Sequence, residues 1–203
     1  MPNLEEILRK NIVTARNFLV SQLDLTPEQI KRLKVNEPEI ILEDKLEGYA
    51  AFAFSTDNKY AFVFRPEAVN DPLAVAEEVA HSIRLILNEE ARRKLFHTNK
   101  DTEENVALVG LEEYFGRYGA LMYLNHLKIA EYNKLWSQIA GGRVTLYTTQ
   151  PADAKSHFLG YVQAEIDFKR LGIQGFKDAL FACDTSVLKD AYQLDLPKIK
   201  LAA

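Results

Sequence analysis

The sequence predicts an α+β fold that is mostly helical, with a small antiparallel sheet packed on one buried helix at 72–88. Apolar residues recur at three- and four-residue spacings over most of the chain, which is typical of amphipathic helices. They alternate at every second position only between about 39 and 65, as in strands. The 203 residues are 47% hydrophobic and 27% charged, an ordinary globular composition. We therefore expect a single domain over 1–203, with N-terminal helices in 1–38, a β-hairpin region in 39–65 and a helical part in 66–203.

Local signals mark where several helices begin. Residues 4–24 carry the first amphipathic pattern, and Thr26-Pro27 then supplies an N-cap and a proline at the first position of a second short helix. Asp71-Pro72 opens the next helix in the same way, and its apolar residues cover so much of the circumference that we expect it to be largely buried. Further helices are expected at about 89–96, 103–125, 126–140, 154–171, 173–182 and 185–192, with 143–149 as strand or loop.

The alternating stretch predicts a β-hairpin. Aromatic residues occupy one face of each run and small residues the other, and the polar turn 55–59 separates the two runs. The aromatic face is expected to form core, and residues 40–42 to add a short strand. The members of the aromatic face are Phe52, Phe54, Tyr60, Phe62 and Phe64.

Composition excludes several classes of function. The net charge of −4 provides no basic field for a phosphate backbone, so no nucleic-acid partner is expected. The single cysteine excludes an internal disulfide framework and a four-cysteine zinc site. No apolar run approaches the roughly 18–20 residues of a membrane span, and the N-terminus lacks a signal-peptide pattern. We therefore expect a cytoplasmic protein without a membrane partner; the oligomeric state cannot be inferred.

Charged residues within the apolar helix 72–88 are the strongest chemical signal. In the segment Glu77-Glu78-Val79-Ala80-His81, Glu77 and His81 are four residues apart and therefore share one helix face, with Glu78 beside them. Two ligands at i and i+4, with a carboxylate next to the first, are the arrangement by which a zinc-peptidase helix holds its metal and activates water.

A hairpin followed by a buried helix with this motif resembles the zincin metallopeptidase fold, whose motif reads HExxH. Here it reads EEVAH, with Glu77 in place of the first histidine. The glutamate-ligand branch of that family carries a downstream helix reading roughly E-G-L-A-x-Y. Glu113, Gly116 and Tyr118 match its ligand, small and aromatic positions, whereas Tyr114 departs from its glycine.

The C-terminal part is also similar to such peptidases. Segments 157–161, 168–172 and 176–180 resemble their paired helices joined at a Leu-Gly, so the resemblance covers about residues 48–182. It implies a metal site made by Glu77, His81 and Glu113, with Glu78 as the general base and a peptide or protein substrate held along the edge strand of the hairpin. Glu112 stays an alternative to Glu113, because one residue is about 100° of helix rotation.

The ligand set determines which metal is expected. Zinc accepts imidazole and carboxylate ligands, but two carboxylates make harder ions such as manganese or iron competitive. Alternatively, the site is degenerate and has lost its metal. The function hypothesis therefore has two forms: a divergent metallopeptidase, which is a hydrolase, or a degenerate relative without peptidase activity. The competing hypothesis is a non-catalytic binding or assembly module, whose Glu/His stripe is a surface ion-pair network. The remaining histidines, His97, His126 and His157, are expected to be surface groups or core groups whose polar atoms have partners.

Overall fold

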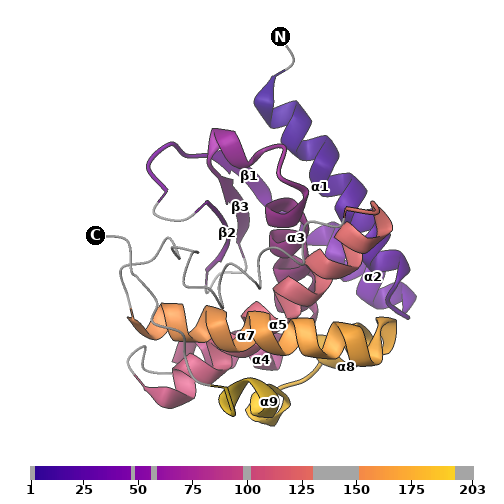
Figure 1. Ribbon diagram of the computed structural model, residues 1–203. Helices are drawn as coiled ribbons and strands as arrows, with labels where there is room; N and C mark the ends of the chain where they lie inside the picture. The colour runs from indigo at the N-terminus through magenta and orange to yellow at the C-terminus, as the bar shows by residue number, and fades with distance from the viewer. Residues whose placement is uncertain (1–2, 47–48, 56–58, 98–101, 130–150, 195–203) are drawn as a thin grey trace.

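The computed structural model describes residues 3–46, 49–55, 59–97, 102–129 and 151–194, which form a mostly helical α+β fold with one small sheet (Figure 1). The expected helix at 126–140, beyond residue 129, and the segment 143–149 lie outside the described residues. The elements are α1 (Leu4–Ser21), α2 (Pro27–Val35), β1 (Glu39–Leu42), β2 (Ala50–Phe54), β3 (Tyr60–Phe64), α3 (Pro72–Leu87), α4 (Glu89–His97), α5 (Glu103–His126), α7 (Pro151–Leu171), α8 (Ile173–Leu180) and α9 (Lys189–Tyr192), with 3₁₀ turns at Pro66–Ala68 and Thr185–Leu188.

The predicted caps are present at the starts of α2 and α3. Thr26 and Gln29 form a capping box, in which each side chain accepts a hydrogen bond from the other's backbone amide, at 3.3 and 2.8 Å. The Asp71 carboxylate accepts from the amides of Leu73 and Ala74. These bonds satisfy backbone donors that have no partner within the helix, so the two helices begin where the sequence predicts.

The sheet has the strand order β1-β3-β2. Strands β2 and β3 form the predicted antiparallel hairpin, with Phe52 opposite Phe62 and Ala53 opposite Ala61. The expectation of a wholly antiparallel sheet is wrong, because β1 pairs in parallel with β3, Ile40 opposite Phe62. The hairpin already occupies one edge of β3, so β1 can pair only with the other edge, and its chain direction makes that pairing parallel.

The aromatic face of the hairpin forms core, as predicted. Tyr60, Phe62 and Phe64 are buried. The Phe52 ring stacks on Tyr60 with centroids 5.9 Å apart, and Phe54 meets Phe96 of α4 edge-on at 4.9 Å. Offset and edge-on ring pairs of this kind add about 0.5–1.5 kcal/mol each to the free energy of area burial. The first pair lies within the hairpin, and the second joins the hairpin to α4.

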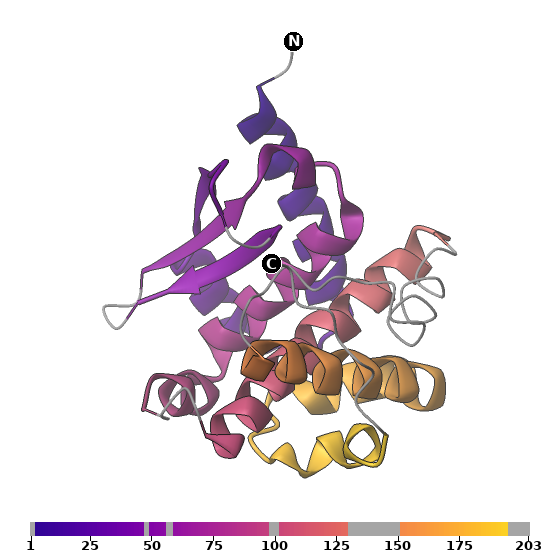
Figure 2. The ribbon, with the colours of Figure 1, turned by 60° about the vertical axis from the view of Figure 1, so that its left-hand side comes forward.

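Helix α3 is the central element. Every residue from Ala74 to Leu87 is buried except Glu78. Figure 1 shows α3 between the sheet and α1. Helix α3 also packs against α5. Figure 2 shows the strands grouped together, with α7 below them. A charged side chain on α3 therefore has to find its partners inside the protein, because neighbouring elements cover nearly all of its surface.

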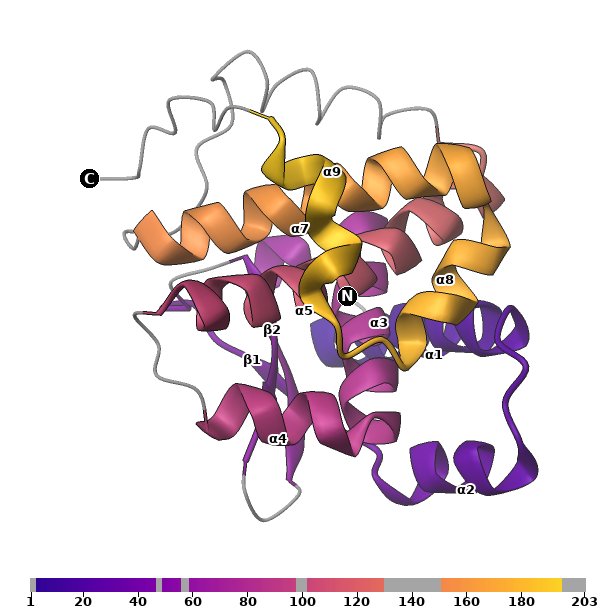
Figure 3. The ribbon, with the colours of Figure 1, turned by 90° about the horizontal axis from the view of Figure 1, so that it is seen from below.

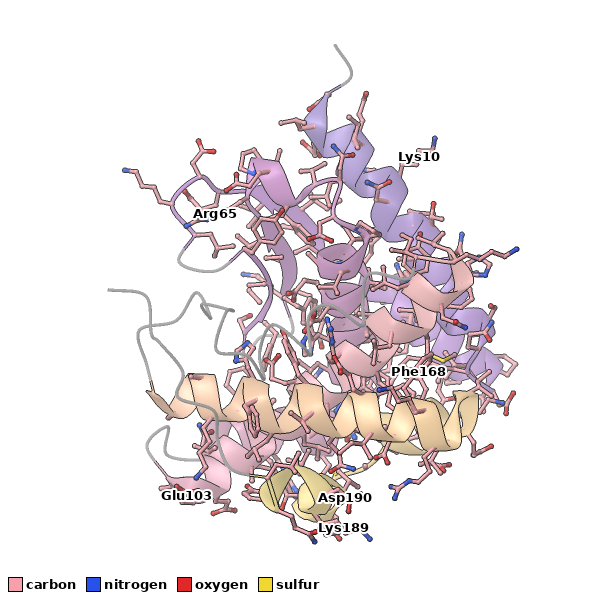
Figure 4. All side chains as sticks on the ribbon, viewed as in Figure 1. Lys10, Arg65, Glu103, Phe168, Lys189 and Asp190 are labelled. Atoms are coloured by element: carbon pink, nitrogen blue, oxygen red, sulfur yellow. The ribbon has the colours of Figure 1, made fainter. Side chains whose placement is uncertain are left out.

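Helices α5 and α7 form the second layer, visible side by side from below in Figure 3. They run in the same direction, because Glu103 at the start of α5 pairs with Lys155 near the start of α7 at 2.6 Å. Buried Gln163 fastens α9 to α7: its side-chain oxygen accepts from the backbone amides of Asp190 and Ala191, both at 3.1 Å. Figure 4 shows Asp190 directly below α7. Within the described ranges, no helix is both long and apolar enough to cross a membrane.

Candidate metal centre

Three of the predicted ligands meet at the junction of α3 and α5. Glu77 and His81 lie one turn apart on α3 and are 5% and 8% exposed. Helix α5 contributes Glu113. One ligand atom from each side chain lies within 4.8 Å of the other two. The expectation of a solvated Glu/His surface stripe is therefore wrong, because this face of α3 is covered by α5.

Glycines allow the helices to come this close. A Cβ at Gly116 of α5 would lie 2.3 Å from Nε2 of His81, so only a glycine leaves room for the imidazole ring. A Cβ at Gly160 of α7 would lie 2.5 Å from Cβ of Glu113. Both distances are far below ordinary van der Waals contact. The two glycines therefore set the close approach of α3, α5 and α7 around the acidic cluster.

The structure assigns different partners to the two neighbouring glutamates of α5. Glu112 is buried and accepts a hydrogen bond from Nε of Arg84 at 2.7 Å. The guanidinium of Arg84, itself 0% exposed, also donates to the backbone carbonyls of residues 179, 180 and 182 around the end of α8. Glu112 is thus held in an ion pair, and Glu113 is the member that joins Glu77 and His81.

Burial controls the protonation of the cluster. Desolvation raises the pKa of Glu77, while the charge of Arg117 and a hydrogen bond from Tyr161 oppose that rise. Oε1 of Glu77 is buried and has no hydrogen-bond partner among the described residues. For His81, burial lowers the pKa to about 3, with the charges of His157 and Arg84 acting in the same direction. The His81 imidazole is therefore neutral at physiological pH, the form that binds metals.

Glu78 is next to this cluster in the chain but is not one of the three residues whose ligand atoms converge. It is half-buried, and the backbone amide of Phe52 in β2 donates a hydrogen bond to its carboxylate. Burial raises its pKa well above the ordinary value, and the charges of Glu77 and Glu113 raise it further. The predicted general base thus sits between the hairpin and the acidic pair.

Sequence reasoning missed three further residues around the cluster. Nε2 of His157 lies 3.4 Å from Oε2 of Glu113, so this histidine pairs with a predicted ligand. Arg117 is 0% exposed, pairs with Glu165 at 3.3 Å and lies over the Tyr161 ring at 5.1 Å. The signal was available: Glu113 and Arg117 on α5, like the ligand pair on α3, are four residues apart within a mostly apolar helix.

The donor set fits a divalent cation. Ligands at about 2.1 Å around a tetrahedral ion are about 3.4 Å apart, so the distances between the three ligand atoms need to shorten by up to about 1.4 Å on binding. Two ionised carboxylates and a neutral imidazole carry −2, which a divalent ion neutralises. Such an ion would also supply the missing partner of Oε1 of Glu77. No protein-family model, curated protein or solved structure matches this chain.

Proposed function

We propose that the protein is a metal-binding, zincin-like protein, a divergent or degenerate relative of metallopeptidases. In this proposal, Glu77, His81 and Glu113 bind one divalent ion. The observation that carries it is the convergence of their three ligand atoms within 4.8 Å in a buried place. A buried ionised carboxylate oxygen without a partner costs free energy, and a bound cation would remove this cost.

The order of elements supports the zincin-like part of the proposal. A hairpin precedes the buried motif helix, its strand β2 packs against that helix, and a glutamate from a later helix completes the cluster. A bound metal would supply Lewis acidity and lower the pKa of any water that it coordinates. In an active enzyme, Glu78 would accept the proton of that water, and the hairpin edge would hold an extended peptide by β-augmentation.

Zinc, manganese and iron are the candidate ions. A neutral imidazole suits zinc, and two carboxylates in a set of three shift the preference towards harder ions. Replacing one imidazole by a carboxylate also leaves the metal less able to acidify water. The proposal is therefore first one of metal binding, and hydrolysis depends on whether a water occupies the remaining coordination position.

Metal content tests the proposal. When the protein is purified without a chelator, elemental mass spectrometry should find one zinc, manganese or iron ion per chain. Once its metal has been removed with a chelator, Glu113→Gln should bind Zn²⁺ at least about 100-fold more weakly than the unsubstituted protein. Disturbing a residue that only supports a ligand typically lowers metal affinity 10–100-fold, and losing the ligand itself should lower it more. Glu104→Gln, an exposed position on the same helix, is the matched control. Equal Zn²⁺ binding by both variants, or no metal in the unsubstituted protein, contradicts the proposal and favours the binding-module hypothesis.

A further inference from the structure

His157 lies at the open side of the cluster. Helix α7 brings it there, and Gly160, one turn further on, allows α7 to approach α5 closely beside Glu113. The His157 side chain is 26% exposed, against 11% for His81 and 13% for Glu113. His157 is therefore the most exposed of these three side chains.

The distance between His157 and Glu113 is closer to that between two ligands of one metal ion than to the length of a hydrogen bond. Nε2 of His157 is 3.4 Å from Oε2 of Glu113. An N–H···O hydrogen bond is usually about 2.7–3.2 Å long, whereas two ligands of one tetrahedral zinc ion are about 3.4 Å apart. His81 approaches the same carboxylate oxygen at 4.0 Å. Two imidazole nitrogens thus lie within 4.0 Å of one oxygen of Glu113. The ligand atoms that converge within 4.8 Å are those of Glu77, His81 and Glu113, so the His157 ring has to swing further inward to share their ion.

We propose that His157 is a fourth protein ligand of the metal ion, completing the set of Glu77, His81 and Glu113. This inference rests on the proposed metal site. Four protein ligands close a tetrahedral site, and closed zinc sites are structural, whereas catalytic zinc sites keep one position for water. The metal then joins α3, α5 and α7 and stabilises the fold. Glu78 has no metal-bound water to deprotonate, so the protein does not hydrolyse peptides.

Cobalt spectroscopy tests this coordination. Metal-free protein is titrated with Co²⁺, whose visible absorption is intense in four-coordinate sites and weak when water raises the coordination number. His157→Gln should lower the Co²⁺ affinity at least about tenfold, and the visible bands should weaken. His126→Gln is the control, because His126 stacks on Phe18 at 4.3 Å at the far end of α5. Unchanged affinity and spectrum in His157→Gln overturn the inference.

A second variant gives a new absorption band if the inference is right, so its result cannot be explained by misfolding. His157→Cys places a thiolate, a strong zinc and cobalt ligand, at the same position. If residue 157 coordinates the ion, this variant should bind Co²⁺ and gain a sulfur-to-cobalt charge-transfer band that the unsubstituted protein lacks. Co²⁺ binding without that band overturns the inference and leaves the three-ligand site intact. A failure of the unsubstituted protein to bind Co²⁺ contradicts the proposed metal site itself, so the two failures are distinguishable.

Discussion

A single methyl group at Gly116 should separate metal binding from folding. In Gly116→Ala, the added Cβ lies 2.3 Å from Nε2 of His81, and ordinary contact begins at 3.4 Å, so the ring has to move by about 1.1 Å. The ligand atoms close around an ion only if this ring is free to adjust, and the methyl group takes up the space beside it. Once the ion is bound, metal–ligand distances tolerate only about 0.2 Å. We therefore predict that Gly116→Ala weakens Zn²⁺ binding at least about tenfold, the lower end of the cost of misplacing a ligand.

Gly110→Ala is the control for this prediction. Gly110 lies on the same helix, and its Cβ would meet a side-chain carbon of Leu188 and the backbone oxygen of Ser156 at 3.3 Å, with no atom of His81 among its nearest contacts. Both variants gain about 1 kcal/mol of helix propensity, and overpacking opposes that gain. Urea denaturation in chelator should show that both variants fold. Competition titration with a chromophoric zinc chelator should show that only Gly116→Ala loses affinity. Equal Zn²⁺ affinity in both variants refutes the reasoning.

Three further predictions follow from the same contacts. Glu77→His creates an HExxH helix, and Zn²⁺ should bind more tightly and displace Mn²⁺ more completely in a competition titration; weaker zinc binding contradicts the ligand role of position 77. Arg84→Met leaves Glu112 buried without its cation and should cost about 3–5 kcal/mol of unfolding free energy in urea, partly recovered by adding Glu112→Met; a loss below about 1 kcal/mol contradicts the buried pair. Glu77→Gln should raise the unfolding free energy of the metal-free protein relative to the unsubstituted one, and the difference should grow as pH rises above 4.5. The same substitution should abolish metal binding.

The sign of the last prediction follows from the protons bound in each state. Burial raises the pKa of Glu77 in the folded protein above its ordinary value of 4.5. Between these two pKa values the folded state holds more protons than the unfolded state, so the stability from this group is lost as pH rises, at up to about 1.4 kcal/mol per pH unit. A glutamine has no proton to lose. Parallel stability–pH curves for the two metal-free proteins contradict a raised Glu77 pKa.

Local signals in the sequence predict most of the described helices and the hairpin. Capping residues such as Thr26 and Asp71 act within one turn, and the alternation of the hairpin fixes which residues share a face. The parallel pairing of β1 depends on which edge of β3 is free, and that is decided by the path of the chain between strands. No local pattern encodes it, and so an antiparallel sheet was expected.

The candidate site was predictable only in part, for a related reason. The spacing of Glu77 and His81 along one helix is readable because the helix period is known. The choice between Glu112 and Glu113 depends on the rotation of α5 against α3, and Arg84 settles it by pairing with Glu112. The approach of His157 depends on how closely a third helix packs, and a sequence read one helix at a time does not show this.

The location of a bound ion tests the central claim most directly. Crystals of the zinc-loaded protein, measured on both sides of the zinc absorption edge, should give one anomalous peak per chain at about 2.0–2.2 Å from Glu77, His81 and Glu113. A peak at that place establishes that α3 and α5 form a metal centre. A fully ordered cluster with no peak, or zinc bound only elsewhere on the protein, contradicts the account.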